Sequence, residues 1–256
     1  MWDSVIIYEQ PMNEHIRACL RLEQLFKNAI HHIGGDSMWD SRAALTAIIH
    51  LGNLLDRADL RSKLRKEIHR QIDNLSRHSQ TPHVDITALN QLLARLESIQ
   101  EKLLSTEGRF GQSIRDNEFL GIVRQHLFNP GGACSFDAPV YYYWQQQPVE
   151  VRQHDLEHWL HEFDSIRSTI TVLLQLIRES AAPKLKVAHD GFYQEPLDPR
   201  ASCQMIRVII PRSANVYPEI SAGKHRISIR YYQPSIYDRP SQSNSDIDFK
   251  LTHCII

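Results

Sequence analysis

The chain has 256 residues, of which 42% are hydrophobic and 23% charged, an ordinary composition for a globular protein with a hydrophobic core. Its 29 Lys and Arg against 30 Asp and Glu give a formal net charge of -1, which argues against a protein held to nucleic acid by bulk charge. We find no membrane-spanning apolar run, no secretory signal and no closely spaced cysteine pair, so we expect a cytoplasmic protein.

The N-terminal region predicts a short strand followed by two helices. The run from Val5 to Tyr8 is β-branched or aromatic and stops at Pro11, which is typical of a strand. Asn13 then caps a helix that ends at Gly34-Gly35. A second helix covers roughly residues 39–55. The inner face of the first helix carries Ile16, Leu20, Phe26, Ile30 and Ile33.

Two longer amphipathic helices follow. After a break at Thr81-Pro82, Asp85 caps the second of them. A short linker between two such helices predicts an antiparallel helical hairpin, whose apolar seam packs on itself, on the other helices or on a second subunit. The seam residues are Leu60, Leu64, Ile68, Ile72 and Leu75 on the first helix, and Leu89, Leu93, Leu96, Ile99 and Leu103 on the second.

Three further segments complete the helical part. A helix over about residues 113–128 stops at Asn129-Pro130-Gly131-Gly132, which no helix can cross. The aromatic run at 140–144 fits either an extended segment or a docked helical turn. The last helix, about residues 151–179, is the most apolar, and we expect it at the centre of the helical domain.

Beyond Pro183 the apolar residues recur at every second position, and no longer at helical spacing. Segments at 206–210, 227–231 and 247–251 alternate in the manner of antiparallel strands with one solvent-exposed face. In the middle segment Ile227, Ile229 and Tyr231 share one face and leave Arg226, Ser228 and Arg230 on the other. The isolated N-terminal strand needs partners, so we assign it to this sheet.

The expected fold class is therefore α+β. A predominantly helical domain, with its antiparallel helical hairpin, covers residues 13–182. Residues 1–12 together with 183–256 form a small antiparallel β domain. The two ends of the chain would build this second domain jointly.

Two patterns suggest chemistry without completing a site. His154, His158 and His161 lie on one helix, and the first pair has the spacing that lets two imidazoles share a zinc ion. A metal-dependent hydrolase is therefore the alternative function, although no further ligand set is evident. Cys134 follows a glycine turn but has no identifiable base nearby, so we interpret it as a buried structural cysteine. We expect no enzymatic activity, no metal and no cofactor.

Basic residues recur on several predicted elements. Arg57, Arg61, Arg65 and His69 recur every four residues along one helix. Each could simply be solvated and paired within its own helix. A second interpretation is that several clusters form a groove for a peptide bearing carboxylates, because the planar guanidinium binds a carboxylate through two parallel hydrogen bonds. The other clusters are Arg17 with Arg21, Arg115 with Arg124, and Lys224, Arg226 and Arg230.

Short sequence blocks spread over nearly the whole chain resemble the ZapD family of cell-division proteins. The most specific is Pro130-Gly131-Gly132-Ala133-Cys134-Ser135-Phe136-Asp137. The others, in the family's order, are Glu9 to Glu14, Leu20 to Glu23, Arg109 to Gln112, Ile122 to Gln125, Leu176 to Ala181, Asp190 to Gln194, Tyr217 to Ser221 and Arg226 to Arg230.

The resemblance implies a homodimer that is recruited to the mid-cell division ring and binds the carboxy-terminal tail of FtsZ. It also implies bundling of FtsZ protofilaments, promotion of Z-ring assembly and a lowered FtsZ GTPase activity, with no membrane or nucleic-acid partner. Family residues that serve tail recognition match Arg21, Arg57, Arg226 and Arg230.

Two other family positions in the tail site are occupied differently here. One basic and one histidine position align with Glu118 and Tyr142. Arg115 and Arg124 are the candidates to replace them. The full predicted tail-binding set is Arg21, Arg57, Arg61, Arg115, Arg124, Lys224, Arg226 and Arg230.

Overall fold

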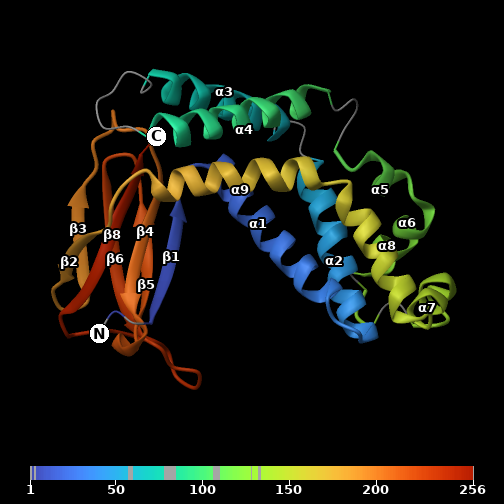
Figure 1. The fold of residues 1–256 in the computed structure, drawn as a ribbon. Helices are drawn as coiled ribbons and strands as arrows, with labels where there is room; N and C mark the ends of the chain where they lie inside the picture. Colours follow the sequence, from blue (N-terminus) through green and yellow to red (C-terminus); the bar gives the residue numbers. More distant parts are fainter. Residues whose placement is uncertain are drawn as a thin grey trace. The chain divides into compact units, whose positions relative to one another are not determined.

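The computed structural model describes residues 2, 4–56, 60–77, 85–105, 110–127, 129–131 and 134–255. The chain divides into two compact units (Figure 1). We call Ala18–Leu173 the helical unit, and Met1–Arg17 together with Leu174–Ile256 the β unit. Helices in one unit and antiparallel sheets in the other confirm the α+β fold class.

The helices begin and end largely where capping residues and glycines predict. The Asn13 side chain accepts a hydrogen bond from the Ile16 amide at 2.9 Å, and Asp85 accepts one from the Ala88 amide at 3.0 Å, so both predicted caps are confirmed. The helices are α1 (Glu14–Ile33), α2 (Met38–Leu55), α3 (Leu60–Arg77), α4 (Ile86–Ser105), α5 (Gln112–Asp116), α6 (Glu118–Leu127), α7 (Pro139–Gln145), α8 (Val149–His161) and α9 (Asp164–Glu179).

Helices α3 and α4 form the predicted antiparallel hairpin (Figure 1). Arg61 near the start of α3 donates to the Leu103 carbonyl near the end of α4 at 2.9 Å, which fixes the antiparallel register. The seam residues Leu64, Ile68 and Leu96 are fully buried. The Thr81-Pro82 break lies outside the described residues. No described helix combines the length and hydropathy that a membrane-spanning segment requires.

Three expectations for the helices are wrong in detail. Ile30 was expected on the inner face of α1 but is 48% exposed. The helix expected over 113–128 is two helices, because Asn117 leaves the helical conformation (φ -72°, ψ 114°) and its side chain caps Leu120 of α6. The helix expected over 151–179 is α8 and α9, which are separated at Glu162 and Phe163.

The break between α8 and α9 places a large side chain against a glycine. Phe163 is fully buried, and a Cβ built on Gly111 would lie 2.6 Å from the Phe163 ring. Gly111 also has φ 65°, in the left-handed region. A residue that has a Cβ atom is destabilised in this conformation, whereas glycine is not. The aromatic run at 140–144 belongs to α7, which begins at Pro139, a favoured first helical residue.

The β unit is a sandwich of two antiparallel sheets (Figure 1). The first sheet has the order β1-β4-β8-β2, and the second has the order β3-β6-β5, with β7 paired to β6. β1 pairs with β4, so the assignment of the N-terminal strand to the C-terminal sheet is confirmed. The strands are β1 (Val5–Pro11), β2 (Lys184–Ala188), β3 (Phe192–Pro196), β4 (Cys203–Pro211), β5 (Tyr217–Ala222), β6 (Arg226–Gln233), β7 (Ser241–Gln242) and β8 (Ile247–Ile255).

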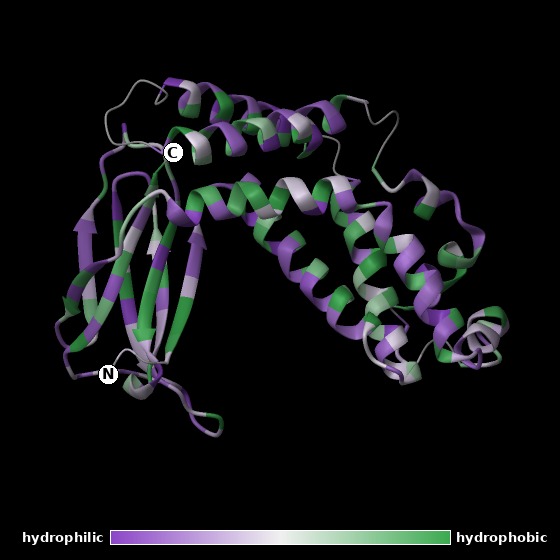
Figure 2. Cartoon of the chain, viewed as in Figure 1, coloured by the Kyte–Doolittle hydropathy of each residue, from purple (hydrophilic) through white to green (hydrophobic). Residues whose placement is uncertain are grey.

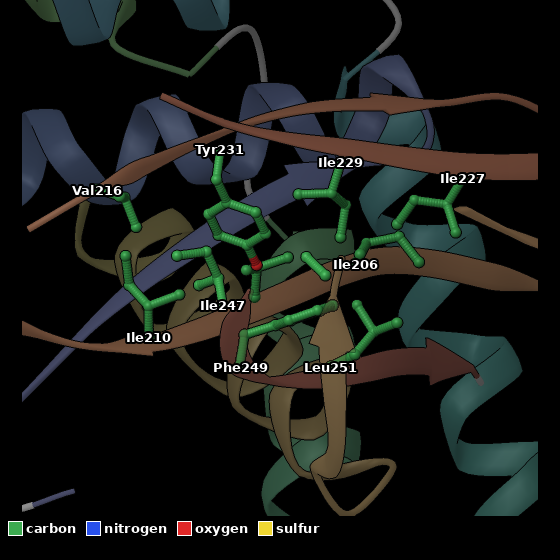
Figure 3. Packing of buried hydrophobic residues seen from close by; sticks show 11 residues of the cluster. Ile206, Ile210, Val216, Ile227, Ile229, Tyr231, Ile247, Phe249 and Leu251 are labelled. Atoms are coloured by element: carbon green, nitrogen blue, oxygen red, sulfur yellow. The ribbon is translucent and has the colours of Figure 1, made fainter. Parts of the chain in front are cut away.

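The core of the β unit lies between the two sheets. Tyr231 and Ile229 of β6 reach toward Phe249 and Leu251 of β8 in the facing sheet (Figure 3), and all four are at most 2% exposed. The alternation of apolar and polar residues along these strands is visible as alternating colour in Figure 2. Such alternation is what two sheets packed face to face require.

Strand β4 departs from the expectation of one solvent-exposed face. Met205 is fully buried and Ile209 is 9% exposed, although they point away from the sandwich core that Ile206 and Val208 enter. On this outer side Arg207 binds Glu9 of the neighbouring β1 at 3.0 Å, and Arg178 of α9 binds the same carboxylate at 2.7 Å. The C-terminal end of α9 therefore attaches to the outer side of this sheet, within the β unit.

Candidate binding surfaces

The outward face of β6 presents the basic residues predicted for the β unit. Ile227, Ile229 and Tyr231 point into the core, so Arg226 and Arg230 point outward, and both are exposed. This confirms the predicted alternation. Lys224 is also exposed, in the short turn before β6. The two arginines are four residues apart on one strand, a separation of about 13 Å.

Arg230 has an aromatic neighbour and an acidic one. Its guanidinium carbon lies 5.5 Å from the centre of the Phe192 ring, a cation–π contact with the residue opposite it on β3. On the other side, Glu219 of β5 is the register partner of Arg230. Within the described part of the chain, however, Arg226 and Arg230 form no ion pair with a carboxylate. Their charges are therefore open to an external anion.

A pair of tyrosines continues the same outward face. The rings of Tyr217 on β5 and Tyr232 on β6 stack with their centres 5.8 Å apart. The face thus combines guanidinium groups with flat apolar rings. This combination suits a peptide that carries both carboxylates and apolar side chains, because each kind of group finds a complementary surface.

The aromatic part of this face was not predicted. Strands β2, β3 and β5 were not recognised from the sequence, so Phe192, Tyr217 and Glu219 were not placed beside the arginines. A period-two signal was present in β3, where Tyr193 and Glu195 are half-buried while Phe192 and Gln194 are exposed. It was missed because the strand has only five residues.

In the helical unit, Arg21 lies beside a hollow between α1 and α2. The hollow has a volume of about 440 Å³, and its exposed lining is mainly apolar. Leu25 and Leu54 supply apolar surface, while Arg21 and His50 carry the groups that can be charged. Gln24 and Asn53 complete the lining. An apolar side chain next to a carboxylate would fit these features.

Two other predicted arginines come together but are largely occupied. Arg115 donates to the Phe110 carbonyl at 2.9 Å and lies 3.5 Å from the Asp56 carboxylate, with only 15% of its side chain exposed. Arg61 stacks over the Phe110 ring at 5.0 Å and donates to Leu103. Both side chains therefore contact Phe110, and their guanidinium groups are engaged within the helical unit.

The remaining predicted residues that lie in the described part of the chain are not brought into these surfaces. Arg124 is half-buried on α6, and Arg57 lies outside the described residues. Glu118 is the first residue of α6, and Tyr142 on α7 is 46% exposed. Among the described residues, no hydrogen bond or ion pair joins Glu118 or Tyr142 to Arg115 or Arg124.

The histidine face of α8 has the character of a solvated helix surface. His154, His158 and His161 are all exposed, and His161 lies 2.6 Å from the Asp164 carboxylate. Across the described residues, no group of three or more His, Cys, Asp or Glu side chains could hold a metal ion. The spacing that suggested zinc therefore has no supporting ligand set in the described structure.

Cys134 corrects a further expectation. Its thiol contacts the Gly131 carbonyl at 3.1 Å, as a cysteine in a turn would, but the residue is exposed and not buried. The sulfur is consequently accessible.

Comparison with known proteins places the chain in a family. The sequence profile of the ZapD family, described as "Cell division protein", matches residues 20–230. A protein named "Cell division protein ZapD" from Coxiella burnetii (strain RSA 493 / Nine Mile phase I) is 40% identical over 255 residues, with 99% of each chain covered. The chain belongs to the ZapD family. Another ZapD, from Methylococcus capsulatus, is 37% identical over 251 residues and covers 98% of both chains.

Family membership assigns a role in cell division. The family description and the relatives' names refer to this process and not to a chemical reaction. The residues matched by the family profile include Arg21 on α1 and both outward arginines of β6.

Proposed function

We propose that this ZapD-family protein binds the anionic carboxy-terminal tail of FtsZ through its exposed arginines and, as a homodimer, cross-links FtsZ protofilaments. Bundling of this kind would promote assembly of the Z-ring at mid-cell and lower the GTPase activity of FtsZ. The observation that carries the proposal is the outward face of β6, where Arg226 and Arg230 are exposed without a carboxylate partner among the described residues.

The chemistry of this face supports a peptide partner. A guanidinium next to an aromatic ring, as in the Arg230 and Phe192 pair, can bind a carboxylate while the ring contacts an adjacent apolar side chain. Exposed charges of this kind are attracted to an acidic segment before contact. They also make the interaction sensitive to salt, because ions screen solvent-exposed charges.

The hollow beside Arg21 offers a second contact of the same type. It combines an exposed cation with apolar surface from Leu25 and Leu54. Each contact alone would be weak. A two-fold dimer with one tail site per subunit binds two tails at once, and many tails along a polymer raise the effective concentration of the second binding event.

Co-sedimentation with FtsZ tests the proposal directly. The protein should pellet with polymerised FtsZ, should fail to pellet when the last residues of the FtsZ tail are removed, and should release FtsZ as salt is raised. Binding that survives removal of the tail would contradict the proposed partner site. Binding that does not change with salt would exclude the arginine contacts.

A charge-reversal variant tests the face of β6. Arg226→Glu with Arg230→Glu should leave a folded dimer but abolish bundling, seen by light scattering and electron microscopy. The matched control is Arg200→Glu with Arg239→Glu, which reverses two exposed loop arginines of the same unit. The control should bundle normally. Equal loss in both variants would attribute the effect to net charge and not to the face.

A further inference from the structure

Helix α3 is strongly basic in a chain that is nearly neutral. Between Leu60 and Arg77 it carries six Lys or Arg residues and only two acidic ones, whereas the whole chain has a net charge of -1. The proposed tail-binding surfaces do not use most of these charges. A concentration of one sign on a single helix raises the local potential and attracts anions.

A hollow between α3 and α4, which we call the α3–α4 hollow, collects part of this charge. Its volume is about 360 Å³, within the usual range for small-ligand sites. All of the described side chains that line it can donate a hydrogen bond, and none is a carboxylate. They are Ser62, Arg65, Lys66 and His69 of α3, and Gln100 of α4.

The two cations in the hollow differ from Arg61 and Arg70 of the same helix. Arg61 is bound to Leu103, and Arg70 is bound to Glu67 at 2.6 Å. Arg65 and Lys66 are exposed, and among the described residues neither forms a hydrogen bond or an ion pair. Their donors are therefore open to a ligand.

The geometry of the hairpin holds these donors on one side. Residues 62, 65, 66 and 69 follow the spacing of a single helix face. Gln100 reaches across from α4, and its amide nitrogen lies 3.4 Å from Nδ1 of His69. On the other side of the ring, the carboxylate of Asp73 lies 3.6 Å from Nε2 of His69. The buried seam residues Leu64 and Ile68 keep α3 from rotating this face away.

We propose that the α3–α4 hollow binds the phosphate groups of a small phosphorylated ligand, either a nucleotide or inorganic polyphosphate. The planar fork of Arg65 can bind two phosphate oxygens, and Lys66 supplies a mobile point charge for a third. Ser62 and Gln100 add neutral donors around the anion. The site is separate from the proposed FtsZ tail contacts and does not depend on them.

Isothermal titration calorimetry at low salt tests the site with two probes, inorganic tripolyphosphate and ATP. The expected result is one site per chain, with an affinity that falls as salt is added. Arg65→Gln with Lys66→Gln should weaken binding of both probes by about tenfold or more, because charge-assisted hydrogen bonds are lost. Tighter binding of ATP would identify a nucleotide as the source of the phosphate, and equal or tighter binding of tripolyphosphate would identify polyphosphate.

The matched control is Arg95→Gln with Lys102→Gln. These two residues are exposed on α4 of the same hairpin, and at about 100° per residue they lie more than a quarter-turn from Gln100. This control removes the same charge and should bind both probes like the unaltered protein. An equal loss in the two variants would overturn the site in favour of a general charge effect.

Three other outcomes would overturn the proposal. One is the absence of binding to either probe at low salt. Another is tight binding of a short DNA duplex without binding of tripolyphosphate, which would make the basic helix a nucleic-acid surface. The third is competition between an FtsZ tail peptide and tripolyphosphate, which would make the hollow part of the tail site. Co-sedimentation of the Arg65→Gln, Lys66→Gln variant with FtsZ should be unchanged, so the two proposals fail separately.

Discussion

The helical unit and the β unit stabilise arginines that are removed from solvent in different ways. Arg152 of α8 is 6% exposed and donates to the carbonyls of Asp36 at 2.8 Å, Ser37 at 3.1 Å and Gln147 at 3.1 Å, and to the Ser41 hydroxyl. No carboxylate contacts it among the described residues. In the β unit, Arg178 and Arg207 instead share the carboxylate of Glu9.

The difference follows from where backbone carbonyls are free. Arg152 donates to carbonyls in the segment before α2 and in the turn before α8, and it shares the Ser37 carbonyl with the Ser41 amide. In the sheet the ladder uses most carbonyls, so Arg207 reaches only the Arg178 carbonyl, at 3.4 Å, and binds mainly a side-chain anion. Arg207 and Glu9 are direct register partners on adjacent strands, which supplies one.

The largest expected effect is on the carbonyl-bound arginine. Arg152→Met should destabilise the helical unit by about 3 kcal/mol or more, because several buried acceptors lose their donor at once. The measurement is urea unfolding combined with hydrogen exchange resolved by segment. Exchange should rise in α2 and α8 while the sandwich core stays protected. The control Arg167→Met removes an arginine that is 40% exposed and paired with Asp164. Similar losses in both variants would contradict the role of burial.

Two glycines with the same left-handed conformation sharpen the comparison of the units. Gly191 in the β unit and Gly131 in the helical unit have φ 68° and 67°. A Cβ on Gly191 would clash with the carbonyl oxygen of Ser243, whereas one on Gly131 meets nothing within 4 Å. Gly131→Ala should cost only the backbone strain, about 1 kcal/mol. Gly191→Ala should cost about 3 kcal/mol, since strain and clash add. Thermal unfolding measures both, and equal costs would show that the Ser243 turn can relax.

The carboxylate-bound arginines should respond to loss of their anion. Glu9→Gln should destabilise the β unit by about 2 kcal/mol, because Arg178 and Arg207 would keep their charges in a half-buried site without a carboxylate partner. The expected free energy is smaller than for a fully buried pair, because the two side chains are 23% and 17% exposed to solvent. Hydrogen exchange of β1 and β4 is the measurement. Glu14→Gln, which removes an exposed pair with Arg17, is the control and should change stability little. Unchanged protection of β1 in the Glu9 variant would contradict the prediction.

The smallest expected effect is a pH dependence in the β unit. Burial pushes the pKa of Glu195 upward, but hydrogen bonds from Tyr193 and Lys186, with the charges of His253 and Lys186, more than offset it and hold the pKa below its ordinary value. Glu195 therefore stabilises the fold above its ordinary pKa, and this stabilisation is lost as the pH falls through the lowered value. The contribution is about 1 kcal/mol or less, because the cost of burying the carboxylate offsets much of what its hydrogen bonds and neighbouring charges supply.

Glu195→Gln tests this dependence. Its melting temperature should fall less between neutral and acidic pH than that of the unaltered protein. Glu219→Gln removes an exposed carboxylate from the same unit and is the control. His253 Nε2 lies 2.8 Å from Glu195 but is not aligned for a hydrogen bond, so its contribution requires a protonated ring. Parallel pH curves for both variants would exclude Glu195 as the source.

Local signals predicted much of the fold because they act within a few residues. Asn13 and Asp85 cap helices through their own backbone neighbours, and Ile227, Ile229 and Tyr231 share a face because strand side chains alternate. The helix breaks at Asn117 and Phe163 were not predicted, because apolar residues continue to recur at helical spacing through both positions. The candidate site was predicted as a set of arginines, but the occupied state of Arg115 depends on Phe110 and Asp56, which no spacing rule connects to it.

By itself, the sequence determined the fold class and the helical hairpin. It also determined that the N-terminal strand must pair with the C-terminal sheet and that Arg226 and Arg230 point outward. These follow from periodicity and capping, which are short-range properties of the chain. Only the tertiary structure decided which cations are engaged and which remain open, as between Arg61 and Arg65. The reason is that a guanidinium's partners come from residues distant in the chain, such as Leu103 for Arg61 and Glu9 for Arg178.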